Sequence, residues 1–199
     1  METTRLEAFS DGVFAIAITL LIIEVRLPAG GGPLARRLAE AWPDYLAYVV
    51  SFVTIGVMWA NHHSLFHLIA RCTHGLVVAN ALLLMFVSFV PFPTSVLGGA
   101  LRGPATEARA AAVFYNGTFV VIAVFFNVLW HMAVRQRLLR PGSREAAARI
   151  TRSYALGPPS YLAATLASTR SAELGLAING ALVLMYWFTP RAPLTAVEP

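Results

Sequence analysis

The chain has 199 residues, of which 57% are hydrophobic and only 13% are charged, and its net charge is +5. Soluble domains carry about 25% charged residues, so this composition excludes an ordinary soluble domain and favours a protein whose main solvent is lipid. The basic residues are arginines that lie between apolar segments, where charges that set membrane topology belong, so they do not indicate nucleic-acid binding. The apolar segments are continuous rather than alternating, which predicts transmembrane helices and not a barrel.

The first predicted helix covers residues 5–25. Glu7 and Asp11 interrupt the apolar pattern of a cleaved signal peptide, so we expect this helix to be retained. A carboxylate within a membrane span is costly and is normally paired inside the bundle, so Asp11 marks a network or functional position. Its partner could be Arg5 or a histidine of the second helix. A structural ion pair and direct ion binding or proton transfer both remain open for Asp11.

Helical spacing places four residues of this helix in one stripe. At about 100° per residue, the stripe contains Ile16, Thr19, Leu20 and Ile23. Ser10 and Asp11 fall on the opposite half of the helix. On spacing alone, the usual interpretation of such a stripe is contact with lipid or with the core of the bundle.

Five further apolar segments are predicted to be transmembrane helices. They cover residues 43–67, 75–101, 110–134, 153–169 and 174–190, and a short amphipathic piece over residues 34–40 precedes the first of them. Pro91 and Pro93 are expected to kink or end the segment that contains them, and Gly157-Pro158-Pro159 to break residues 153–169 near their start. The prediction is an all-α integral membrane protein with one domain over residues 1–199 and six transmembrane helices per subunit.

Polar residues at the end of the second helix form a candidate network. His63 and His67 are four residues apart, as in some metal sites, but no Glu or Cys follows in a ligand-like pattern, so no metal site is predicted. The preferred interpretation is a structural polar network that contains Arg5, Ser10, Asp11, Trp59, Asn61 and either His62 or His63. Asn80 and Asn127 lie within apolar spans and are expected to join helices.

The arginines also predict the orientation in the membrane. Of the 15 arginines, nine lie on the same side as the N-terminus, and six of these nine fall between residues 135 and 152. Because arginines are enriched in short cytoplasmic loops, both termini are predicted to be cytoplasmic in a multi-pass protein of the cell membrane.

The first helix resembles a known family signature. The run Phe9-Ser10-Asp11, followed by Gly12-Val13-Phe14-Ala15-Ile16-Ala17-Ile18-Thr19-Leu20-Leu21, is similar to the first helix of the transmembrane protein 175 family of potassium channels. The resemblance is specific over residues 5–24, and Trp59-Ala60-Asn61-His62-His63 supports it. Animal members have two six-helix repeats, so a chain with one repeat resembles a prokaryotic member.

The resemblance implies a homotetramer in which the first helices line a pore for K⁺. In the family, the residue five positions beyond the signature Asp forms the narrowest hydrophobic constriction, which corresponds to Ile16, and further layers correspond to Leu20 and Ile23. Thr19 matches a hydroxyl implicated in cation selectivity in some members. The sequence lacks the Thr-Val-Gly-Tyr-Gly carbonyl filter, so we expect weak to moderate K⁺ selectivity, a gate that works by dewetting, and no cofactor.

The main alternative is a proton-coupled secondary transporter that uses Asp11 and the histidines as proton carriers. Such transporters usually contain inverted repeats or broken helices around a midplane site, and only residues 153–169 are clearly interrupted. An enzyme is not expected, because the sequence shows no activated nucleophile, paired carboxylates or phosphate-binding loop.

Overall fold

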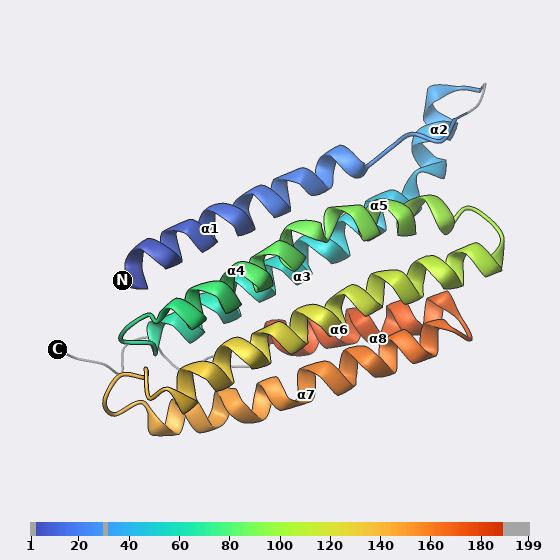
Figure 1. Ribbon diagram of the computed structural model, residues 1–199. Coiled ribbons are helices and arrows are strands. Elements are labelled where there is room, and N and C mark those ends of the chain that lie inside the picture. Colours follow the sequence, from blue (N-terminus) through green and yellow to red (C-terminus); the bar gives the residue numbers. More distant parts are fainter. Residues whose placement is uncertain (1–2, 30–31, 189–199) are drawn as a thin grey trace.

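The computed structural model describes residues 3–29 and 32–188, and within them the chain is a bundle of roughly parallel and antiparallel helices (Figure 1). The elements are α1 (Thr3–Leu20), η1 (Leu21–Glu24), α2 (Leu34–Glu40), α3 (Trp42–His67), α4 (His74–Phe89), α5 (Pro91–Ala100), α6 (Ala105–Arg135), α7 (Arg144–Ser168) and α8 (Ala172–Phe188). An isolated antiparallel bridge joins Ile69 to Leu139 between two loops at one end of the bundle. The predicted all-α fold is confirmed.

Four helical segments of the described chain are long and apolar enough to cross a membrane. They are Thr3–Glu24, Trp42–His67, His74–Ala100 and Ala105–Arg135. Residues Ala172–Trp187 of α8 form a shorter apolar helix. The predicted number of six transmembrane helices therefore stays a prediction for α7 and α8.

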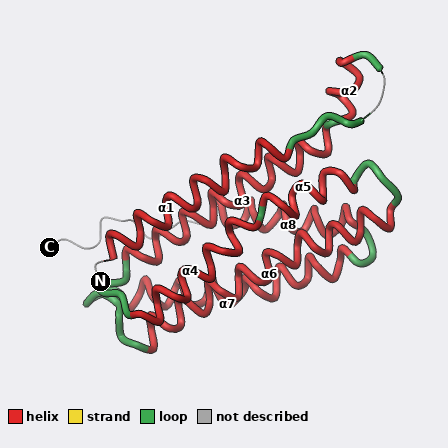
Figure 2. Tube along the Cα trace, turned by 45° about the horizontal axis from the view of Figure 1, so that its top comes forward, coloured by secondary structure: helices red, strands yellow, loops and turns green. Residues whose placement is uncertain are grey.

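The first helix lies at the edge of the bundle, beside α3 and α4 (Figures 1 and 2). Its inward residues recur at helical spacing, and they are Thr3, Leu6, Ser10, Phe14 and Ala17 of α1 and Leu21 of η1. Only 28% of the apolar stretch within Thr3–Glu24 is buried inside the subunit, which is the lowest fraction among the four candidate membrane spans. One face of α1 is thus fixed to the bundle, and the other is uncovered within the subunit.

The predicted kink at Pro91 and Pro93 is confirmed as a break at Val90 between α4 and α5. The hydroxyl of Thr94 donates a hydrogen bond of 2.8 Å to the Val90 carbonyl at this break. Since that proton is used, Thr94 accepts from Ser51 at 2.8 Å, and Ser51 in turn accepts from the Tyr115 hydroxyl at 2.9 Å. This buried chain of hydroxyls joins α3, α5 and α6 around the break.

The predicted break at Gly157-Pro158-Pro159 is wrong, because α7 runs through these residues without interruption. The helix also begins at Arg144, before the expected start at residue 153. Pro158 has no N–H to offer the carbonyl four residues earlier, which belongs to Tyr154. The side-chain amide of Asn127 on α6 donates to that carbonyl at 2.9 Å, so a neighbouring helix supplies a hydrogen bond where the proline cannot.

A second amide cluster joins α6, α7 and α8. Asn179 donates to Asn116 at 2.7 Å, and Asn116 donates to Ser168 at 2.9 Å, with all three side chains fully buried. The helices approach closely here, since a Cβ built on Gly175 would lie 2.8 Å from the Ala164 carbonyl oxygen. Glycine at this position is therefore required by the spacing of α7 and α8.

Candidate functional site

The stripe predicted on the first helix is exposed within the subunit. Ile16, Leu20 and Ile23 are 60%, 40% and 66% exposed, and Thr19 also lies on the exposed face. Exposing several neighbouring isoleucine and leucine side chains to water is unfavourable in free energy. Lipid or another protein chain must therefore cover this face. The exposed surface is broader than the stripe, since Phe9 and Ile22 are exposed as well.

Thr19 presents an oxygen atom on this otherwise apolar face. Its hydroxyl donates to the carbonyl of Ile16 at 2.9 Å, one turn earlier in the same helix. With its proton held by the backbone, the oxygen retains its lone pairs as acceptors. Such an oxygen can contact a cation, whereas the neighbouring aliphatic side chains cannot.

On the opposite face, Ser10 anchors α1 through a buried polar chain. The Ser10 hydroxyl donates to the Leu6 carbonyl at 2.7 Å and accepts from the amide of Asn80 on α4 at 3.0 Å. The Asn80 oxygen lies 2.7 Å from Nε2 of His62 on α3. Because the oxygen can only accept, Nε2 must carry the proton, so the network assigns the tautomer of His62. One hydrogen-bonded chain therefore ties α1, α4 and α3 together.

His62 is enclosed by aromatic rings on its other sides. It is 1% exposed, stacks on Phe66 at a centroid distance of 4.5 Å, and lies 5.3 Å from the ring of Phe14 on α1. Phe126 on α6 contacts the same ring edge-on at 6.5 Å. The imidazole is thus fixed between three helices by both hydrogen bonding and packing.

Asp11 makes a second, more exposed contact between α1 and α3. The indole N–H of Trp59 donates to its carboxylate at 2.8 Å, and the ring of His63 stacks on Trp59 at 6.0 Å. His67 lies 5.7 Å from His63, one turn further along α3. Arg5 is exposed, and no ion pair joins it to Asp11 although both residues are described.

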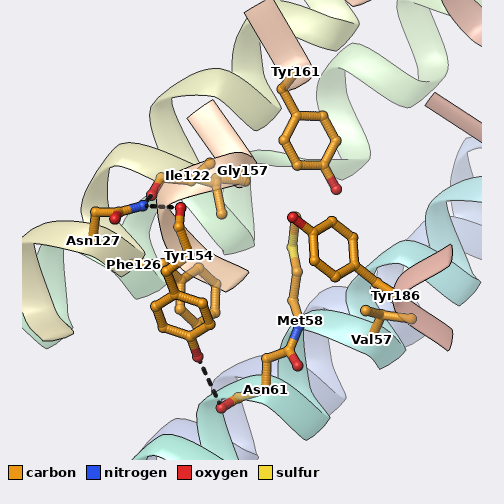
Figure 3. A pocket seen from close by; sticks show the side chains of 11 residues that line it. Val57, Met58, Asn61, Ile122, Phe126, Asn127, Tyr154, Gly157, Tyr161 and Tyr186 are labelled. Carbon is orange, nitrogen blue, oxygen red and sulfur yellow. Dashed lines mark hydrogen bonds between the residues drawn. The ribbon is translucent and has the colours of Figure 1, made fainter. Parts of the chain in front are cut away.

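The structure brings together some of the predicted network residues but not all of them. Ser10 and His62 share one chain of hydrogen bonds, while Asp11, Trp59 and His63 form the other contact. Asn61 does not reach Asp11, because its side chain points into a cavity between α3, α6, α7 and α8 (Figure 3).

Asn80 is the central residue of the buried hydrogen-bonded chain, and the predicted network did not include it. It was expected only to join helices, yet it links Ser10 to His62 and is fully buried. The available signal was an amide within a charge-free apolar span, which requires polar partners inside the bundle. In the described part of the chain, no three His, Cys, Asp or Glu side chains gather as a possible metal site.

The helices of this chain are long and apolar, and their polar side chains form hydrogen bonds between helices. These features define a polytopic helical membrane protein. Residues 5–91 match the family described as "Endosomal/lysosomal potassium channel TMEM175". A protein of Chamaesiphon minutus named a potassium channel is 46% identical over 197 residues, covering 96% of this chain and 95% of that protein. The chain belongs to the TMEM175 family, as the first-helix signature predicted.

A solved structure extends this relationship to the fold. The crystal structure of a lysosomal potassium-selective channel TMEM175 homolog from Chamaesiphon minutus superposes with a TM-score of 0.84 at 43% identity, covering 93% of this chain and 96% of that one. The Bos taurus protein named endosomal/lysosomal proton channel TMEM175 is 34% identical over 156 residues, covering 72% of this chain and 32% of that protein. The bovine relative is thus about three times longer than the region it shares with this chain.

Proposed function

We propose that this protein is a potassium-selective cation channel in which the first helices of a homotetramer line a central pore. The observation that carries the proposal is the two-sided character of α1. Its inner face is anchored through Ser10 and Asp11, while its apolar outer face, which contains Ile16, is exposed within the subunit. The Chamaesiphon minutus relative that is named a potassium channel, 46% identical over nearly its whole length, supports the same function.

The gate of this channel is a set of apolar rings from the exposed stripe. Four copies of Ile16, Leu20 and Ile23 around an axis form a narrow passage from which water withdraws, and a dry constriction blocks ions without a moving plug. The Thr19 oxygens supply the polar ring within this passage. Since the sequence contains no carbonyl filter of the Thr-Val-Gly-Tyr-Gly type, the selectivity for K⁺ over Na⁺ is weak to moderate.

Each subunit crosses the cell membrane six times, with both termini in the cytoplasm. The 17 residues of α8 span about 26 Å, close to the hydrocarbon thickness of about 30 Å. The 25 residues of α7 span about 38 Å, so its arginine-rich start extends beyond the hydrocarbon core. K⁺ is the permeant ion, and the channel uses no cofactor.

Purified protein in planar bilayers with asymmetric K⁺ and Na⁺ tests the function. A channel gives unitary currents whose reversal potential lies nearer to the K⁺ equilibrium potential than to that of Na⁺. Because the bovine relative is named a proton channel, a second series with a pH gradient measures proton current. Coupled flux without unitary currents would overturn the channel and favour a transporter that uses Asp11 and the histidines.

The oligomeric state is measured separately. Native mass spectrometry of detergent-solubilised protein should give four copies of the 21.5 kDa chain. A monomer or dimer that still conducts would contradict the four-helix pore.

A further inference from the structure

A cavity of about 50 Å³ lies between α3, α6, α7 and α8, and no residue of α1 lines it. Figure 3 shows the side chains that line it. None of its lining residues carries a formal charge at neutral pH, and most of the lining is apolar. The lining includes Met58, Asn61, Phe126, Gly157, Tyr161 and Tyr186. A charged ligand would lose its hydration here without gaining a counter-charge, so the lining excludes ions.

Three polar groups face the cavity. The hydroxyls of Tyr161 and Tyr186 point toward each other, and the side-chain amide of Asn61 points toward the same space (Figure 3). Each phenol can donate one hydrogen bond and accept up to two. Gly157 lies beside this arrangement, and a Cβ there would stand 3.8 Å from the Tyr186 oxygen, an ordinary van der Waals distance. The cavity therefore offers convergent donors and acceptors inside an apolar frame, as small-molecule sites do.

The volume limits the ligand. A cavity needs about 10–15 Å³ to hold one water molecule, so 50 Å³ accommodates roughly three or four non-hydrogen atoms. We propose that this cavity binds a small uncharged alcohol of two or three carbons. Its hydroxyl bonds to Tyr161 and Tyr186, and its alkyl part packs against Met58 and Phe126.

The position of the cavity connects it to the anchors of α1. Met58 and Asn61 lie on the same turn of α3 as Trp59 and His62, which hold α1 through Asp11 and Asn80. Phe126 lines the cavity and also contacts the His62 ring. A bound alcohol therefore shifts the turn of α3 that positions the first helix, and it changes the K⁺ conductance. This consequence for conductance rests on the proposed function, whereas the binding itself does not.

The binding is tested by crystallography with 2-bromoethanol, which has four non-hydrogen atoms and a bromine that scatters anomalously. We expect an anomalous bromine peak in the cavity of the wild-type protein. Ala123→Leu fills the space opposite Gly157 and should abolish the peak, whereas Ala163→Leu, at an exposed position on α7, should keep it. A wild-type cavity that holds only water at saturating 2-bromoethanol would overturn the proposal.

A second pair of variants tests the hydrogen bonds and does not depend on the folding of Ala123→Leu. The double variant Tyr161→Phe/Tyr186→Phe should weaken the bromine peak at least several-fold. Tyr48→Phe removes a phenolic oxygen outside the cavity and should leave the peak unchanged. An equal peak in both variants would show that the hydroxyls do not bind the alcohol.

Single-channel recording measures the coupling. Ethanol in the millimolar range should change the open probability of the wild-type and Ala163→Leu proteins and leave Ala123→Leu unaffected. A bromine peak without any effect on currents would contradict the coupling through α3 and leave the binding site standing. A protein that carries no current at all contradicts the proposed function, and the crystallographic result still decides the binding.

Discussion

Ile16 is the residue on which the proposed gate depends. Its side chain is 60% exposed in the subunit and is the first residue of the apolar stripe. Ile16→Asn places an amide in each position of the narrowest ring, so water should remain in the constriction. We expect the current of the resting channel in planar bilayers to rise at least several-fold.

Ile22 provides the matched control for this variant. It is 56% exposed in η1, the 3-10 turn that follows α1, and it lies roughly 80–120° from Ile16 around the axis. Ile22→Asn should therefore leave the resting current close to that of the wild type. Unchanged current in Ile16→Asn, or an equal increase in both variants, means that Ile16 does not form the constriction.

Thr19 is the residue on which the proposed selectivity depends. Its hydroxyl proton is held by the Ile16 carbonyl, so its oxygen faces outward as an acceptor. Thr19→Ala removes this oxygen and should shift the reversal potential under K⁺/Na⁺ gradients toward zero. Thr19→Ser keeps the oxygen and should retain most of the selectivity. A Ser variant as unselective as the Ala variant would assign the effect to the methyl group instead.

The residues that anchor α1 could be predicted from the sequence only in part. The sequence predicts Ser10, Asp11 and Trp59 as members of the polar network, and it leaves open whether His62 or His63 joins them. The sequence alone does not fix which way each side chain points. Asn61 and His62 are consecutive, so they lie about 100° apart on α3, and only His62 can face Asn80 while Asn61 faces the cavity.

At the scale of elements, α7 depends on a hydrogen bond from a neighbouring helix. Asn127 donates to the Tyr154 carbonyl, which lies four residues before Pro158. Asn127→Leu preserves the volume but removes this donor, and the loss of a part-buried hydrogen bond costs about 1 kcal/mol. The thermal unfolding midpoint in detergent should therefore fall.

A double-mutant cycle with Pro158→Ala tests whether the Asn127 amide compensates for the N–H that Pro158 lacks. This substitution restores a backbone N–H four residues after Tyr154, so it should recover part of the lost stability in the Asn127→Leu background. In the wild-type background the same change should stabilise less, because the carbonyl already accepts from Asn127. Equal effects in the two backgrounds would show that Asn127 does not compensate for the proline.

The hydrogen bond from Asn127 also explains why the prediction of a helix break succeeded at one proline pair and failed at the other. Local propensity assigns a break to both pairs. At Pro91 and Pro93 the chain does break at Val90, and at Pro158 and Pro159 it does not. The difference is an amide from α6, whose position depends on tertiary packing that local propensity does not contain.

The contact between α7 and α8 gives a second prediction about elements. A Cβ on Gly175 would lie 2.8 Å from the Ala164 carbonyl, so Gly175→Ala forces the two backbones apart and should cost about 1–3 kcal/mol. Gly180 lies on the same helix with open space around its Cβ position. Gly180→Ala should instead gain about 0.5–1 kcal/mol through helix propensity. Thermal unfolding of both variants in detergent measures the contrast, and equal midpoints would contradict the close approach.

At the scale of the whole molecule, the question is what covers the outer face of α1. The helix lies at the edge of the bundle, with its other face held by α3 and α4 (Figure 2). Lipid could cover an apolar stripe as well as another subunit could, because the hydrocarbon chains are equally apolar. Burial within one subunit identifies the uncovered face of α1, and the distance between copies of Ile16 tests whether that face lines a pore.

Disulfide trapping measures that distance. Cys72 is the single cysteine of the chain, so Cys72→Ser gives a background without thiols. Ile16→Cys in this background should form disulfide-linked dimers on mild oxidation in membranes, because a constriction brings neighbouring Cβ atoms within reach of a disulfide, about 3.5–4.5 Å. Val128→Cys, on the exposed surface of α6, should remain monomeric. If Ile16→Cys also remains monomeric while the protein conducts K⁺, the ions pass elsewhere and α1 faces lipid.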